Sequence, residues 1–386
     1  MQPLCLGTDQ NEGSWVEVPA AEPGAVPPCC GLHATDPAYR RNFSVYGSAL
    51  CVTSARDFAE DHGRGCTCSK LKRSYEWRPR TCRLVDWSSA HFCALLGSRR
   101  RVLLVGDSTM HQAFVTLHNY VRWGARSSRV GRQNKAWGTD CAARIAYWSS
   151  DTLIGESYGT VLGGMNRGET LANALANVTA LQAAEGSPPP LVLLSAGAHI
   201  KLEPGDTHGF SHAWSMDAQH AQKTPFDLLI SKVATVLRPF RDRAMLVWKI
   251  QNPAGCGASV LDRLPYDGHA NSTFWRAQIR KGTHAPWQWP YFGTMDASAA
   301  RALRGIASVL DTTPISLRAD AHISSPGTGG AGFRKKHDCL HLCHGSADGG
   351  PLGLLPRLLL HALVTRQIKL HAPSARGERL LRNASS

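Results

Sequence analysis

The chain has 386 residues, of which 43% are hydrophobic, and a formal net charge of +14. This composition excludes an intrinsically disordered chain and predicts a folded protein with one large domain or two ordinary ones. No apolar run reaches the roughly 20 residues of a membrane-spanning helix; the best candidate, residues 352–364, contains Pro356 and Arg357. The charge suits an acidic polysaccharide, or a basic surface without a specific partner. No zinc-finger, RNA-recognition or helix-turn-helix signature is present, so no nucleic-acid partner is expected.

The cysteines and glycosylation sequons indicate a cellular compartment. The 12 cysteines lie mainly between Cys5 and Cys93 and lack the companion His/Cys sets of zinc sites, which favours disulfides over reduced thiols without a role. Sequons for N-glycosylation begin at Asn42, Asn177, Asn271 and Asn383. Together these features favour the lumen of the secretory pathway. Residues 1–11 lack the layout of a signal peptide, so we expect a targeting segment or membrane anchor that this sequence does not include.

Composition divides the chain into three parts. Residues 1–40, rich in Pro, Gly and Ala, are predicted to form a loop-rich leader pinned by Cys5, Cys29 and Cys30. Residues 41–365 are predicted to form a single domain, whose first part, residues 41–98, is rich in cysteine. Residues 366–386 are predicted to form a solvated basic tail.

Aromatic and basic side chains alternate in residues 75–82 of the Cys-rich part. Tyr75 and Trp77 are interleaved with Arg78 and Arg80, and Cys82 follows. Such a stretch could stack on sugar rings and bind their carboxylates. Alternatively, the aromatic rings could be half-buried and pack a disulfide-linked subdomain.

Apolar runs alternate with helical patterns in the rest of the chain. Together they predict an α/β fold: a parallel sheet with helices on both faces, irregular insertions, and the disulfide-rich N-terminal subdomain. An irregular insertion is expected at residues 263–292. Strands are predicted at residues 101–106, 244–249 and 309–311, and within residues 191–199, where an apolar strand ends in small residues and a polar side chain. Helices are predicted at residues 109–120, 171–183, 225–237, 297–306 and 354–364.

The first predicted strand ends at Gly106, and a helix follows from Thr109. Ser108 therefore lies where the strand turns into the helix, at the carboxyl end of the sheet. Free backbone N–H groups at the start of that helix could stabilise a developing oxyanion. Alternatively, Asp107 or Ser108 merely caps the helix, since both residue types are favoured caps.

Acyl transfer needs a nucleophile, a base and a group that orients the base. Ser108 could attack an acyl carbon, His341 could take its proton, and Asp338, three residues earlier, could hold the imidazole tautomer. Ligand sites in parallel sheets lie at the carboxyl ends of the strands, which predicts that Ser108, His199 and the loop with Asp338 and His341 share one edge. A single histidine is more often a structural residue whose ring nitrogens are hydrogen-bonded. The prediction of a catalytic site therefore depends on Ser108, Asp338 and His341 together.

These motifs resemble the SGNH/GDSL hydrolase superfamily. More closely, they are similar to the PC-esterase group, which includes the plant trichome birefringence-like polysaccharide O-acetyltransferases. Plant members carry an Arg and then an Asn after Gly-Asp-Ser, where this chain has His111 and Gln112. The matching pieces, in family order, are Trp77-Arg78-Pro79 with Cys82, Gly106-Asp107-Ser108, Arg318-Ala319-Asp320-Ala321-His322 and Asp338-Cys339-Leu340-His341-Leu342-Cys343.

The resemblance implies an SGNH-like catalytic domain over residues 41–365, with a triad of Ser108, Asp338 and His341. It also implies disulfides near the site and no metal or other cofactor, with an acetyl donor such as acetyl-CoA or an acetylated intermediate as co-substrate. The residues carried over to the oxyanion hole or the substrate site are Asp107, Gly197, His199, Arg318 and His322.

Three functions remain open from the sequence. The first is an O-acetyltransferase that moves acetyl groups onto glycan or polysaccharide hydroxyls through an acetyl-serine, usually in the Golgi lumen or membrane-associated. The second is a carbohydrate acetylesterase that uses the same triad with water as acceptor. The third is a non-catalytic glycan-binding protein. Secretion from the cell is the alternative to the Golgi.

Overall fold

The structure is a computed structural model. It describes residues 2–18, 74–97, 100–123, 141, 144–150, 152–154, 171–198, 225–251, 292–317, 322–324, 337–342 and 351–368. The predicted insertion at 263–292, except for its last residue, lies outside these ranges, as do residues 369–386 of the predicted tail.

A five-stranded parallel sheet forms the centre of the fold, with the strand order β4-β3-β5-β6-β7. Its three inner strands are short runs of apolar residues that are buried throughout, as expected for a parallel sheet covered on both faces. The strands are β3 (Val102–Gly106), β4 (Ile145–Ser149), β5 (Leu191–Leu194), β6 (Met245–Lys249) and β7 (Ser308–Leu310). The structure thus confirms the predicted α/β class and adds β4, an edge strand that the sequence did not predict.

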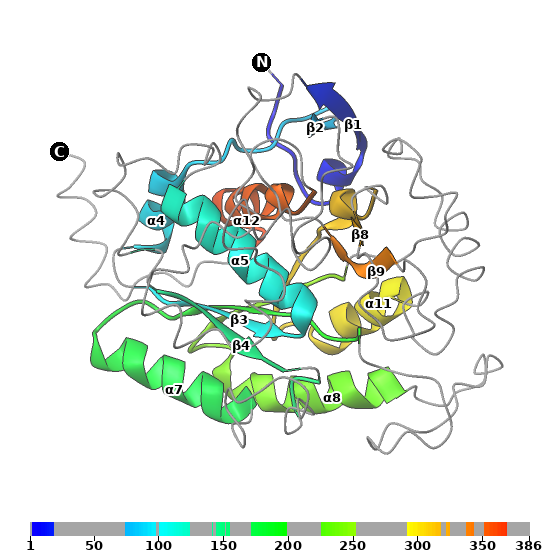
Figure 1. The fold of residues 1–386 in the computed structure, drawn as a ribbon. Coiled ribbons are helices and arrows are strands. Elements are labelled where there is room, and N and C mark those ends of the chain that lie inside the picture. Colours follow the sequence, from blue (N-terminus) through cyan, green and yellow to red (C-terminus); the bar gives the residue numbers. More distant parts are fainter. Residues whose placement is uncertain are drawn as a thin grey trace, which may run out of the picture.

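Helices cover both faces of this sheet (Figure 1). Side chains of β3 alternate between the two: Val102 and Leu104 pack in one core, and Leu103 and Val105 in the other. The first core is closed by α4 (Ser89–Leu96), α5 (Ser108–Trp123) and α12 (Leu354–Val364), and the second by α7 (Leu171–Ala184), α8 (Pro225–Leu237) and α11 (Phe292–Ala302). None of the described helices is long and apolar enough to cross a bilayer.

The boundaries of α11 and of the C-terminal tail differ from the predictions. Helix α11 begins at Phe292, earlier than the predicted residue 297, because Phe292, Met295, Ala299 and Leu303 form a buried stripe at helical spacing. The predicted basic tail also starts too early. Ile368 is buried and its N–H donates to the carbonyl of Ala362, so the folded part extends past residue 366.

The predicted loop with Asp338 and His341 is a strand instead. β9 (His337–Leu342) pairs antiparallel with β8 (His322–Ser324) in a separate two-stranded sheet. Its register places His322 opposite Leu342. β8 has only three residues, and His337, Asp338 and His341 interrupt the apolar residues of β9, so neither strand gave an apolar run.

Residues 2–18 of the predicted leader belong to the folded domain and are not loop-rich, and its residues 19–40 lie outside the described ranges. After a 3-10 turn, η1 (Asp9–Asn11), the strand β1 (Gly13–Val18) pairs antiparallel with β2 (Ser74–Pro79). The expected pinning by Cys5 is confirmed, because a disulfide joins it to Cys82. Cys29 and Cys30 lie outside the described residues. A second disulfide, Cys93–Cys141, supports the predicted disulfide framework and an oxidising compartment.

Aromatic residues attach this hairpin to the rest of the molecule. Trp77 is buried, packs edge-to-face against Trp15 at 5.8 Å, and donates from Nε1 to the carbonyl of Gln10. Trp15 donates from Nε1 to the carbonyl of Pro314 beside the main sheet. Tyr75 is also buried. The packing interpretation of residues 75–82 therefore holds, and sugar stacking on Tyr75 and Trp77 is wrong.

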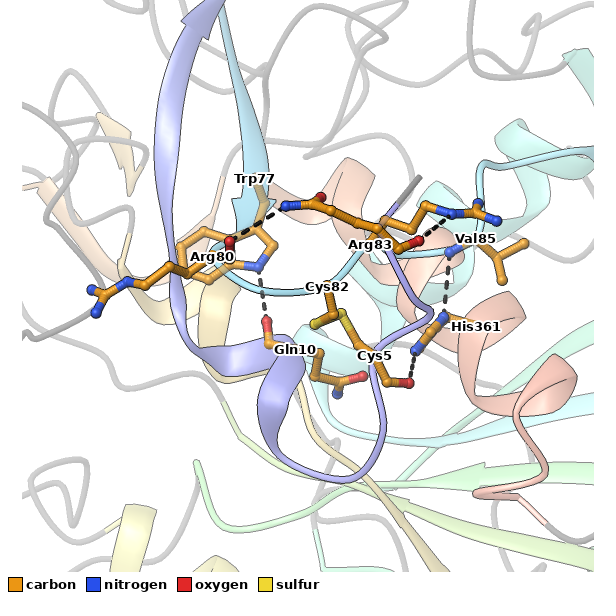
Figure 2. Close-up of a disulfide and its surroundings, with 9 residues drawn as sticks. Cys5, Gln10, Trp77, Arg80, Cys82, Arg83, Val85 and His361 are labelled. Carbon is orange, nitrogen blue, oxygen red and sulfur yellow. Dashed lines mark hydrogen bonds between the residues drawn. A yellow bond between two sulfur atoms is a disulfide. The ribbon is translucent and has the colours of Figure 1, made fainter.

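His361 connects the N-terminal segment to α12 (Figure 2). The N–H of Val85 donates to Nδ1 at 3.3 Å, so Nε2 carries the hydrogen and donates to the carbonyl of Cys5 at 3.0 Å. Burial lowers the pKa of His361, and the charge of Arg357 acts in the same direction against the hydrogen bond to Cys5. The folded protein therefore holds this imidazole neutral.

We expect the free energy of unfolding to fall as the pH drops below about 6.5, the pKa of an unfolded histidine. The unfolded imidazole binds a proton before the folded one does, so this contribution is complete above that pH and is lost below it. His361→Gln keeps a donor for Cys5 but does not titrate. Urea unfolding should therefore show that the wild type has a higher free energy of unfolding than His361→Gln at pH 8. This difference should become smaller as the pH falls to 5.

The exposed His91 of α4 gives a matched control, because His91→Gln removes an imidazole without breaking this link. Its unfolding curve should follow the wild type at every pH. If the free energies of unfolding of the wild type and of His361→Gln changed with pH in the same way, the lowered pKa of His361 would be contradicted.

Candidate active site

The strand order identifies one edge of the sheet as the place for a ligand. From β3 the chain continues to β4 on one side, and β5 lies on the other side. In doubly wound sheets this reversal opens a crevice outside the carboxyl ends of the two strands. Here the residues that follow those ends are Asp107 and Ser108 after β3, and Ser195 to Gly197 after β5.

The turn after β3 requires glycine, because β5 approaches it closely. A Cβ on Gly106 would overlap the carbonyl oxygen of Ser195 and lie 2.5 Å from Cγ of Met110. The Tyr147 hydroxyl on β4 lies 2.9 Å from the carbonyl oxygens of both Gly106 and Asp107 and donates to them. Ser108, half-buried, is the first residue of α5. The turn therefore holds this serine at a helix N-terminus at the carboxyl end of the sheet.

Asp107, and not Ser108, is the N-cap of α5, a role that the sequence left open between these two residues. Its Oδ1 accepts from the backbone N–H of Thr109 at 2.9 Å and from the Thr109 hydroxyl at 2.6 Å, which is the usual N-cap geometry. Asp107 is buried. The Asp107 carboxylate therefore fixes the turn that presents Ser108.

Gln112 joins α5 to β9. Its Nε2 donates to the carbonyl of Leu342 at 2.7 Å, and the Leu342 N–H donates back to Oε1 at 3.2 Å. Both bonds are buried. Gln112 lies one helical turn after Ser108, on the same side of α5. The backbone of His341, next to Leu342, is thus held beside the part of α5 that Ser108 begins.

The other residues predicted for the site have mixed outcomes. Asp338 and His341 are described by their backbone in β9, and His322 by its backbone in β8. His199 and Arg318 lie outside the described residues. The structure thus places Ser108 and Gly197 after the ends of two neighbouring strands, and it bonds the strand that carries Asp338 and His341 to the helix that Ser108 begins.

The two departures from the plant pattern have structural roles. Gln112 makes the bonds to Leu342 described above. His111 is buried, with its ring 5.0 Å from the Tyr147 ring and 6.2 Å from the Phe114 ring, centroid to centroid. At these positions the chain packs β9 and β4 against α5.

A buried charged group near this edge was not predicted. Lys249, the last residue of β6, is only 1% exposed, and its Nζ donates to the carbonyl of Ile250 at 3.0 Å. Burial lowers the pKa of Lys249 to about 8, while the negative charges of Asp296 and Asp107 act to raise it. In the sequence, the only indication of this buried ammonium group was a lysine at the end of an apolar strand.

Asp296 of α11 is the partner that the sequence did not reveal. Its Oδ1 accepts from Nε1 of Trp248 at 3.1 Å, and its Oδ2 from the N–H of Gln251 at 2.9 Å. Burial raises the pKa of Asp296 to about 7, against these two hydrogen bonds and the charge of Lys249. The carboxylate therefore holds the end of β6 from the side of α11.

Within the described ranges, no group of three or more His, Cys, Asp or Glu side chains could hold a metal ion. The sequence matches no protein-family model and no curated protein. What the described arrangement offers chemically is a half-buried hydroxyl at a helix N-terminus, with a histidine-bearing strand held beside that helix.

Gln112→Ala should loosen β9, because it leaves the N–H and C=O of Leu342 without these buried partners. Unsatisfied buried groups cost about 1–3 kcal/mol, so urea unfolding should show a loss of this size. Hydrogen–deuterium exchange measured by mass spectrometry should become faster in the peptide that covers β9.

Gln182 serves as a matched control. It is buried, and its Oε1 accepts from the N–H of Arg101 at the opposite end of β3. Gln182→Ala should lower stability without faster exchange in β9. Unchanged exchange in Gln112→Ala would show that other contacts hold the strand.

Proposed function

We propose that the protein is an O-acetyltransferase that moves an acetyl group onto glycan or polysaccharide hydroxyls through an acetyl ester of Ser108. The observation that carries the proposal is the pair of hydrogen bonds between Gln112 and Leu342. They support a site in which His341, from the far end of the chain, reaches the serine that begins α5. The resemblance to PC-esterases adds the substrate class.

The proposed chemistry has two steps. Ser108 Oγ attacks the acetyl carbon of the donor while His341 takes the hydroxyl proton, and the donor's leaving group departs with that proton. A glycan hydroxyl then attacks the acetyl-serine, gives its proton to His341, and Ser108 Oγ recovers a proton as the ester bond breaks. Asp338 orients the imidazole, and backbone N–H groups at the start of α5 stabilise each oxyanion.

The two disulfides support action in an oxidising compartment, and we assign the protein to the Golgi lumen within it. Asn177, which begins one of the sequons, is exposed on α7. It is therefore accessible on the folded surface, as a glycan-bearing residue must be. The positive net charge of +14 suits an acidic glycan as acceptor.

Intact-protein mass spectrometry after incubation with 4-nitrophenyl acetate or acetyl-CoA tests the acetyl-serine. We expect one acetyl group on the wild type and none on Ser108→Ala. A serine-directed fluorophosphonate should show the same difference. Ser89 begins α4 as Ser108 begins α5, so Ser89→Ala is the matched control and should be labelled like the wild type.

Adding an acceptor polysaccharide distinguishes transfer of the acetyl group from its hydrolysis. An acetyl-enzyme whose decay speeds up when an unacetylated polysaccharide is added, with acetyl groups appearing on that polysaccharide, supports transfer. Decay to free acetate at the same rate with and without polysaccharide indicates an acetylesterase. No labelling of the wild type by either reagent would contradict serine catalysis and leave a glycan-binding scaffold.

A further inference from the structure

Gln251 lies two residues after the end of β6, and its side chain extends to the end of β5. Its Nε2 donates to the carbonyl of Ala196 at 2.6 Å, and the residue is only 6% exposed. The side chain lies against the next residue as well. A Cβ on Gly197 would overlap Gln251 Nε2 and lie 3.0 Å from its Cδ. The amide therefore occupies space that only a glycine leaves open.

This contact determines the direction of one backbone N–H group. The carbonyl of Ala196 and the N–H of Gly197 belong to one planar trans peptide, in which C=O and N–H point in opposite directions. Because Gln251 holds the carbonyl, the Gly197 N–H is directed away from Gln251. On its side opposite β6, β5 neighbours β3, the strand that leads to Ser108.

The end of β5 is also fixed against the end of β3. The N–H of Ser195 donates to the carbonyl of Val105 at 3.2 Å, and the Ser195 carbonyl lies so close to Gly106 that no Cβ fits there. A donor on Gly197 is thus held at a short backbone distance from the turn that presents Ser108.

Gln251 is itself anchored. Its backbone N–H donates to Asp296 Oδ2, and the other carboxylate oxygen accepts from Trp248 Nε1. The carboxylate is buried on α11, so the position of Gln251 is set by a helix on one side and by β6 on the other. This chain of contacts runs from α11 through β6 to the end of β5.

We propose that Gln251 is a positioning residue: it orients the Gly197 peptide so that its N–H donates to the oxyanion formed when Ser108 reacts. This inference rests on the proposed function. Gln251 acts through the backbone of residues 196 and 197 and does not touch the reacting atoms.

Gln251→Met tests the role of the hydrogen bond, because methionine keeps nearly the same volume against Gly197 but has no donor. We expect kcat for 4-nitrophenyl acetate hydrolysis to fall about 10–100-fold, since small misplacement of a catalytic donor has effects of this size. KM should change by less than about twofold, because an oxyanion donor acts in the transition state.

Gln182→Met is the matched control. It removes the side-chain acceptor of another buried glutamine, at the opposite end of the sheet. Both variants should lose thermal stability, but only Gln251→Met should lose kcat. Equal losses of kcat in the two variants would assign Gln251 a merely structural role and overturn the inference, and so would a kcat for Gln251→Met within twofold of wild type.

A second variant covers the case in which Gln251→Met does not fold. Gln251→Asn keeps the amide but shortens its reach by one methylene, so it should also lower kcat with little change in KM; an unchanged kcat would overturn the inference. If the wild type hydrolyses the ester and Ser108→Ala does not, catalysis by Ser108 stands whatever the Gln251 variants show, and transfer is still tested by the added polysaccharide. If the wild type neither hydrolyses the ester nor forms an acetyl-serine, both proposals fail.

Discussion

The side-chain amide of Gln112 bonds both backbone groups of Leu342, across 230 residues of sequence, and the candidate site depends on this link. Both bonds are buried, so breaking them leaves polar groups without compensation from water. An amide that satisfies the N–H and the C=O of one residue also fixes that residue's orientation, as a neighbouring strand would. The helix that starts at Ser108 and the strand that carries His341 are therefore held together.

A second set of links attaches the N-terminal segment to the same core. Cys5 reaches α12 through His361, Gln10 reaches the carbonyl of Asp311, and Trp15 reaches that of Pro314. Each bond joins residues about 300 or more positions apart. With the Cys5–Cys82 disulfide, these links make the hairpin of β1 and β2 part of the domain (Figure 1). The Cys5–Cys82 disulfide forms in an oxidising compartment, and the many cysteines of the chain point to the same kind of compartment.

The sequence predicted those parts of the fold that contain an apolar run or a helical period. Apolar runs identified β3, β5, β6 and β7, and periodic stripes identified α5, α7, α8 and α12. The edge strand β4, with an exposed residue among buried ones, lacked such a run. β1, β2 and β9 were missed because polar or charged residues interrupt their apolar residues, and β8 because it has only three residues. Similarly, Gly106-Asp107-Ser108 is a local motif and was found, whereas Gln251 and Asp296 meet only in the folded chain.

The charges at the carboxyl edge of the sheet act together. Asp107 and Asp296 are both buried, and Lys249 lies where both of their charges raise its pKa. Burial lowers the pKa of Lys249 to about 8 and raises that of Asp296 to about 7, so at neutral pH each charge offsets part of the cost of burying the other. The same positive charge acts on any anion that forms beside Asp107 at the start of α5, where the helix N-terminus has the same electrostatic sign. Lys249 therefore interacts electrostatically with both Asp296 of α11 and Asp107, which caps the helix that begins at Ser108.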